Sequence, residues 1–101
     1  MKEKDFSVLL LYDVYAPLLS EKKRVAFELS YWQDLSLSEI AEHTGTTRQG
    51  VRELINRTCD ELAGFEEALH FAKIQKELLK ISDEIEREHP DISDRIKASL
   101  N

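Results

Sequence analysis

One stretch of the sequence, from Leu35 to Arg57, constrains the fold more than any other. It opens with Ser36 and Glu39, which have the spacing of a capping box: the serine hydroxyl accepts a hydrogen bond from the glutamate N–H, and the glutamate side chain returns one. Gly45 then supplies the left-handed backbone that a tight helix exit needs. The stretch therefore predicts a short helix that ends in a sharp turn.

A second helix is expected directly after this turn. Thr47 is a suitable N-cap for it, and Thr46 paired with Gln49 is the alternative. The positions that would face inward in the two helices are small or apolar, as a steep crossing of two helices across a short turn requires. They are Ile40, Ala41, Val51, Leu54, Ile55, Thr58 and Leu62. The pattern predicts a helix-turn-helix.

The rest of the chain is also predicted to be helical, so the expected fold class is all-α. Only three glycines and two prolines interrupt the 101 residues. A first helix can start from Asp5 as N-cap and should end or kink before Pro17. A second can start from Ser20. Its apolar stripe is expected to run through Val25, Leu29 and Trp32, with Phe27 and Tyr31 at its flanks.

The C-terminal part differs in composition from the part before it. After Gly64 the sequence predicts a long, highly charged helical segment that ends before Pro90, with a short tail helix possible over residues 93–100. We therefore divide the chain into a helix-turn-helix core, residues 1–64, and a C-terminal helical extension, residues 65–101. The extension would belong to the same compact domain or to a dimer interface.

The C-terminal extension carries an apolar stripe beyond the apolar residues that one small core needs. The stripe comprises Phe71, Ile74, Leu78, Ile81 and Ile85. Such a stripe suits a partner helix or a homodimer, and the alternative is that it folds back onto the first helix. We favour the dimer.

Polar side chains on the outward face of the second motif helix suit nucleic acid. Arginine and glutamine, as at Arg48, Gln49 and Arg52, can make bidentate contacts with guanine and adenine edges in a major groove, and Asn56 faces the same way. Thr47 and the free N–H groups at the helix start suit a phosphate. The alternative interpretation is a packing unit that has no nucleic-acid ligand.

Charge sets a limit on this interpretation. The whole chain carries a formal net charge of -6, which opposes attraction to phosphates. Between Thr44 and Arg57, however, there are three arginines and one glutamate, a local net charge of +2. We expect binding that is weak for a monomer and stronger for a dimer. Gly50 lies inside the reading helix and marks either close approach of a ligand or a tolerated defect.

Other classes of protein are disfavoured by what the sequence lacks. The three histidines have no ligand spacing, Cys59 stands alone, and no phosphate-binding loop occurs. We expect no enzyme, no cofactor and no metal site. No apolar run approaches the length of a membrane span, and the N-terminus has no signal-peptide pattern, so a cytoplasmic protein without membrane insertion is expected.

The block from Tyr12 to Thr58 resembles the YlxM family of small bacterial helix-turn-helix proteins, most clearly in YAPLLSEKKR, ELSYWQDLSLSEIAE and TRQGVRELINRT. More distantly it is similar to the promoter-reading C-terminal domain of sigma factors. The resemblance implies a sigma-like helical bundle with a long C-terminal helical extension. By resemblance, Thr47, Arg48, Gln49, Arg52 and Arg57 match the recognition helix of sigma-like domains. The partner that we expect is nucleic acid, with DNA favoured over RNA. Because family members are encoded beside signal recognition particle components, an accessory role in that pathway is a further expectation, and the alternative is a protein- or RNA-interaction module that binds those components.

Overall fold

The structure, a computed structural model, describes residues 7–100. Within this range the secondary structure is helical and contains no strand, which confirms the expected all-α class. The proposed cap Asp5 lies outside the described residues. The elements in chain order are α1 (Val8–Tyr15), the 3-10 turn η1 (Ala16–Leu18), α2 (Glu21–Tyr31), α3 (Leu37–Thr44), α4 (Arg48–Leu69), α5 (Phe71–Ile85) and α6 (Pro90–Ser99).

Local capping explains where α2, α3 and α4 begin. The Ser20 hydroxyl accepts a hydrogen bond from the Lys23 N–H at the start of α2. The capping box of α3 is complete, with both hydrogen bonds between Ser36 and Glu39 formed at 3.0 and 3.1 Å. The bond from the Ser36 N–H also holds the pKa of the Glu39 carboxyl below its usual range. These helix starts are where the sequence predicts them.

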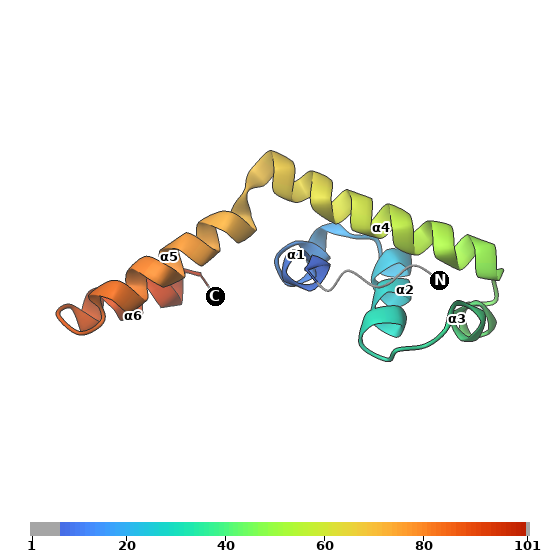
Figure 1. The fold of residues 1–101 in the computed structure, drawn as a ribbon, viewed down its shortest axis with the longest axis horizontal. Coiled ribbons are helices and arrows are strands. Elements are labelled where there is room, and N and C mark those ends of the chain that lie inside the picture. Colours follow the sequence, from blue (N-terminus) through green and yellow to red (C-terminus); the bar gives the residue numbers. More distant parts are fainter. Residues whose placement is uncertain (1–6, 101) are drawn as a thin grey trace.

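The long helix α4 runs along the whole length of the core (Figure 1). Helices α1, α2 and α3 all lie against one side of it, and each makes contacts with it. One core cluster lies between α1, α2 and α4 and includes Tyr15, Phe27 and Leu62. A second cluster lies between α2, α3 and α4 and includes Ala26, Ile40 and Val51. The helix-turn-helix is thus fixed to the rest of the core through α2 and α4.

The buried face of α2 differs from the expected one. Val25 is 39% exposed and Trp32 is 51% exposed, whereas Ala26, Phe27 and Ser30 are buried. Phe27 determines this orientation, because its ring stacks between Tyr12 and Tyr31 with centroid distances of 4.4 and 4.3 Å. The predicted stripe was therefore wrong for Val25 and Trp32, whereas Leu29 packs against the second core cluster.

The C-terminal helices also differ from expectation in their limits. Helix α4 continues through Gly64 to Leu69, and the break comes at His70, which has a left-handed backbone with φ of 56°. Helix α5 ends at Ile85, and Pro90 begins α6 instead of only ending the segment before it. Proline is well suited to the first position of a helix, because the N–H that it lacks would have no intrahelical partner there.

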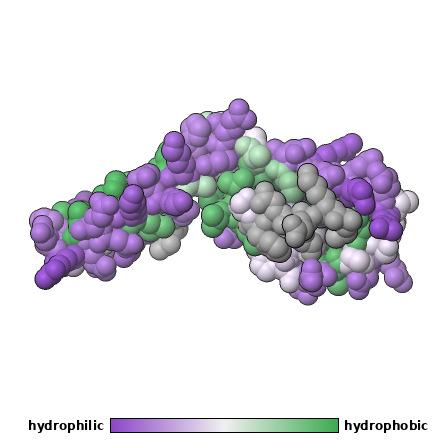
Figure 2. All heavy atoms as spheres, viewed as in Figure 1, coloured by the Kyte–Doolittle hydropathy of each residue, from purple (hydrophilic) through white to green (hydrophobic). Residues whose placement is uncertain are grey.

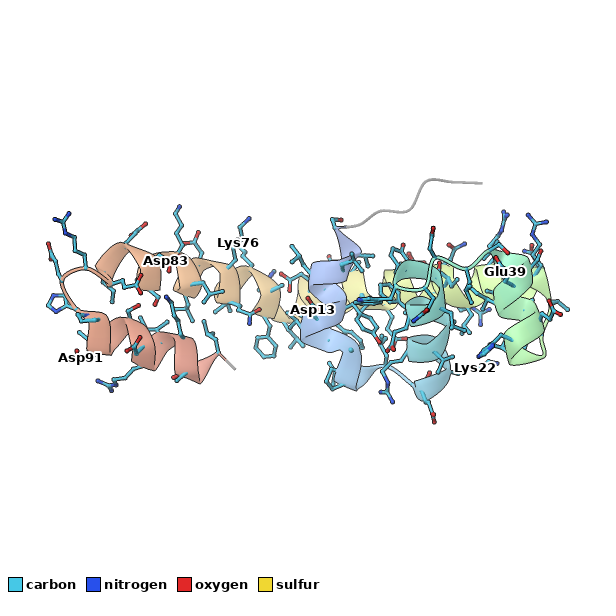
Figure 3. The ribbon with its side chains drawn as sticks, turned by 90° about the horizontal axis from the view of Figure 1, so that it is seen from below. Asp13, Lys22, Glu39, Lys76, Asp83 and Asp91 are labelled. Carbon is cyan, nitrogen blue, oxygen red and sulfur yellow. The ribbon has the colours of Figure 1, made fainter. Side chains whose placement is uncertain are left out.

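Helices α5 and α6 form a hairpin, which we call the arm (residues 71–99). The arm extends to one side of the core, and its two helices lie side by side (Figures 1 and 3). The described chain measures 55 × 26 × 24 Å along its principal axes. The radius of gyration of 17.2 Å exceeds the value of about 13 Å that is usual for a compact domain of this length.

Candidate nucleic-acid interface

The helix-turn-helix consists of α3, the turn at Gly45 and the first turns of α4. Gly45 has a φ of 71°, as the sequence predicts for the exit of the first motif helix. Thr44 and Thr46 flank it, and both hydroxyls are bonded: Thr44 donates to the Ile40 carbonyl at 2.9 Å, and the two hydroxyls lie 3.0 Å apart. Threonines in this turn therefore stabilise the motif without apolar side chains.

The inward side of α4 is fully occupied by core packing. Its buried residues are Val51, Ile55, Thr58 and Leu62. The Thr58 hydroxyl, which is 0% exposed, donates to the Leu54 carbonyl at 2.7 Å. A helix whose inner face is fixed in this way can offer a ligand only its opposite face and its N-terminal end.

The residues predicted to contact nucleic acid are all exposed: Thr47, Arg48, Gln49, Arg52, Asn56 and Arg57. At about 3.6 residues per turn, Gln49 and Asn56 lie opposite the buried face. Arg48 and Arg52 lie on one flank of that outward face, and Arg57 lies on the other. In the described part of the chain none of the three arginines forms an ion pair. Their guanidinium groups are available to an external anion.

The same helical period reveals two residues that the sequence analysis did not single out. Glu53 and Asp60 lie at the centre of the outward face, between the two arginine flanks, and both are exposed. The Gln49 side-chain amide donates to Glu53 at 3.5 Å. Counting outward positions by helical phase, instead of searching for basic residues, would have found both. A carboxylate at this position lies one helical turn from Arg57 and can accept a hydrogen bond from a base amino group.

Gly50 has a local structural explanation. Its N–H donates to the Thr47 hydroxyl at 3.0 Å, which completes the N-cap of α4. A Cβ at this position would come 3.1 Å from the same hydroxyl oxygen and meets no other atom within 4 Å. Glycine thus leaves the Thr47 cap undisturbed. Of the two N-caps that the sequence allowed, Thr46 and Thr47, the structure uses Thr47.

The apolar stripe lies at the other end of α4 from these residues. A helix of 22 residues spans about 33 Å, so the outward arginines and the arm are well separated. Within the stripe, Phe71, Ile74 and Ile81 are exposed in a single copy of the chain, whereas Leu78 and Ile85 are half-buried. The predicted nucleic-acid face and the predicted partner face are therefore two distinct surfaces.

Two features that residues 7–100 lack bear on other types of site. These residues contain no group of three or more histidine, cysteine, aspartate or glutamate side chains that could hold a metal ion. None of the helices described there is both long enough and apolar enough to cross a membrane.

Comparison with known proteins agrees with this geometry. The family model described as "Putative helix-turn-helix protein, YlxM / p13 like" (UPF0122) matches residues 2–100. A UPF0122 protein of Clostridium kluyveri is 42% identical over 76 residues, which cover 75% of this chain and 68% of that protein. A UPF0122 protein of Caldanaerobacter subterraneus is 42% identical over 84 residues, covering 82% and 72%, and one of Ureaplasma urealyticum is 40% identical over 68 residues, covering 67% and 69%. The chain belongs to the UPF0122 family of YlxM/p13-like helix-turn-helix proteins.

Proposed function

We propose that this chain is a non-enzymatic regulatory protein of the cytoplasm that binds nucleic acid, duplex DNA in preference to RNA, through the first turns of α4. The observation that carries the proposal is the pair of exposed arginine flanks, Arg48 with Arg52 and Arg57, on a helix whose opposite face is buried in the core. Flanking cations fit the two phosphate ridges of a major groove, and the polar residues between them fit base edges.

The charge distribution supports nucleic-acid binding by the outward face of the first turns of α4, which we call the reading face. The arginine-bearing stretch has a net charge of +2 in a chain of net charge -6. Charges farther apart than about 8 Å are largely screened at physiological salt, so the acidic groups elsewhere weaken binding without preventing it. The expected affinity of one copy is therefore low, and both salt and oligomeric state should influence it strongly.

The test is a mobility-shift or fluorescence-anisotropy titration with a pool of duplex DNA fragments and, in parallel, a pool of structured RNA at about 50 mM salt. Arg48→Ala combined with Arg52→Ala should weaken DNA binding by about tenfold to a hundredfold, because each lost phosphate or base contact contributes on the order of 1 kcal/mol. The matched control is Arg87→Ala with Arg95→Ala, which removes two exposed arginines from the C-terminal hairpin formed by α5 and α6. Equal losses in both double variants, or unchanged binding in the arginine variant, would contradict the assignment.

A second candidate function is an accessory role in the signal recognition particle pathway, in which the arm contacts a protein or RNA component. The observation that favours it is the exposed apolar side of α5. Recovery of targeting components on immobilised chain after nuclease treatment would support a protein contact. Loss of that recovery in the arginine variant would instead indicate that nucleic acid mediates it.

A further inference from the structure

The arm has no apolar core in a single copy of the chain. Among the described residues of α5 and α6, the buried ones are two serines, Ser82 and Ser93, each 0% exposed. Their hydroxyls lie 2.7 Å apart, and Ser82 also donates to the Ser93 carbonyl at 3.0 Å. These small polar residues let the two helices approach closely, but they contribute little hydrophobic stabilisation.

Large apolar side chains of the arm remain at the surface instead. Their exposed fractions lie between 39% and 54%, for Phe71, Ile74, Leu79, Ile81 and Ile92. Hydrophobic residues are visible along the arm and where it leaves the core (Figure 2). Helices of 15 and 10 residues are marginal in water without burial of an apolar face. Another surface must therefore cover this hairpin for it to be stable.

The core of the same copy is not in a position to cover it. The first residue of the stripe reaches the core, where Phe71 stacks near Tyr15 with a centroid distance of 6.4 Å, and the arm then extends away from it (Figure 1). The carboxylate of Glu66 fixes the direction of α5 by accepting hydrogen bonds from the Ala72 and Lys73 N–H groups at 2.9 and 3.1 Å. The arm is thus held away from the core with its apolar side open.

The spacing of the stripe suits a second helix of the same kind. Phe71, Ile74, Leu78, Ile81 and Ile85 are separated by alternating steps of three and four residues, which is the repeat of a coiled-coil seam. Two hairpins that join along such a seam form a four-helix bundle. The stripe therefore fits another helical hairpin better than it fits an extended segment.

The charges along α5 favour a second copy of the chain in an antiparallel orientation. The first part of the helix carries Lys73, Lys76 and Lys80 against one acid, Glu77, and the last turns carry Asp83 and Glu84. An antiparallel pair that crosses near Leu78 brings Lys73, five residues before the crossing, beside Glu84 of the other copy, six residues after it. A parallel pair would align like charges, which is unfavourable.

The end of the arm already uses two of its acids internally. Lys97 lies 3.3 Å from Asp83 and 3.7 Å from Glu86, and Figure 3 shows Asp83 on α5 with α6 beside it. Those two carboxylates are paired within one copy, whereas Glu84 between them forms no ion pair among the described residues.

The exposed apolar area is of the size that a dimer needs. Large apolar side chains expose about 200 Å² each when free, so Phe71, Ile74, Ile81 and Ile92 leave on the order of 400 Å² per copy at their observed exposures, before the half-buried Leu78 and Ile85 are counted. A stable interface buries about 800 Å² per partner, of which roughly 56–65% is apolar. The two values match.

We propose that two copies of this chain pair through their arms, with the α5 helices antiparallel and crossing near Leu78, to form a four-helix bundle that holds the two helix-turn-helix cores apart. The interface is isologous, so each contact occurs twice. This pairing does not require nucleic acid and can hold whether or not the reading face binds it.

The test is the mass of the full chain by sedimentation velocity between about 1 and 100 µM, concentrations at which a standard interface associates. Wild type should sediment at twice the chain mass of 11.7 kDa. Ile74→Glu with Ile81→Glu should weaken the dimer by at least about a hundredfold and leave the helical signal of the core intact, because both side chains are exposed in the single copy. The matched control is Val25→Glu, which adds a charge at an equally exposed apolar residue of α2 and should not change the mass.

A charge exchange tests the orientation. Lys73→Glu alone should weaken the dimer by roughly threefold to tenfold, and adding Glu84→Lys should restore it. A wild-type monomer at 100 µM, or a dimer that survives the double glutamate variant, would overturn the pairing. A charge exchange that fails to restore the dimer would overturn the antiparallel register.

Discussion

At the scale of single residues, Glu66 is the side chain that connects α4, α5 and α1 by hydrogen bonds. Its carboxylate accepts hydrogen bonds from the Tyr15 hydroxyl at 2.6 Å and from two N–H groups at the start of α5. The Tyr15 hydroxyl in turn accepts one from the Phe71 N–H at 3.1 Å. One side chain of α4 thereby caps α5 across the left-handed His70 and ties both helices to α1.

Replacing this carboxylate should destabilise the fold in a pH-dependent manner. The bond from Tyr15 is the main cause that lowers the pKa of Glu66. A lowered pKa means that ionised Glu66 stabilises the folded state above the ordinary glutamate pKa of about 4.3, and that this contribution is lost as pH falls through the lowered value. We expect Glu66→Gln to reduce the free energy of unfolding by about 1–2 kcal/mol at pH 7, measured by urea denaturation, and by clearly less at pH 3.

The neighbouring residue provides the control. Glu67→Gln removes the same charge from an exposed position one residue away, and it should change the stability by less than about 0.5 kcal/mol. A similar loss in both variants would mean that overall charge, and not the cap of α5, is responsible.

At the scale of secondary-structure elements, the helix starts could be predicted and two other features could not. Caps such as Ser36 and Thr47 depend on residues three positions apart, so the sequence contains the whole interaction. The break at His70 depends on Tyr15, far away in the chain, and no local signal marks it. The buried face of α2 was also missed, because Ala26 and Ser30 are small and the exposed Trp32 is large and apolar.

Gly64 in α4 and Gly45 in the turn after α3 should respond in opposite ways to substitution by alanine. Gly64 lies inside α4, and an added Cβ meets no atom within 4 Å, so Gly64→Ala should raise the free energy of unfolding by about 0.5–1 kcal/mol through helix propensity. Gly45 has a φ of 71°, so Gly45→Ala should lower it by about 1 kcal/mol although space is open there too. Thermal and urea denaturation of both variants measure the contrast, and a stabilised Gly45→Ala variant would show that the turn is not held in this conformation.

At the scale of the whole molecule, the sequence indicated both surfaces but not their arrangement. The outward polar face and the apolar stripe follow from helical period, which is local. Their separation along one continuous α4 does not, because Gly64 suggested a boundary that the helix passes through. The acidic residues of the outward face of α4, Glu53 and Asp60, were missed because only basic and neutral polar residues were taken as the signal for nucleic acid.

The salt dependence of DNA binding should report how many copies engage the duplex. Each phosphate neutralised contributes about -0.9 to the slope of log K against log salt, so the three arginines of one core predict a slope of about -3 and two cores on one duplex about -5. Anisotropy titrations of one duplex fragment pool between about 50 and 200 mM KCl measure this slope. Wild type should give the steeper value, and Ile74→Glu with Ile81→Glu should give the shallower one, because that variant keeps its reading face but loses the arm contact. If both proteins bind with the same slope, the number of phosphates contacted does not depend on the arm. The two cores then do not act on one duplex together, whatever the oligomeric state.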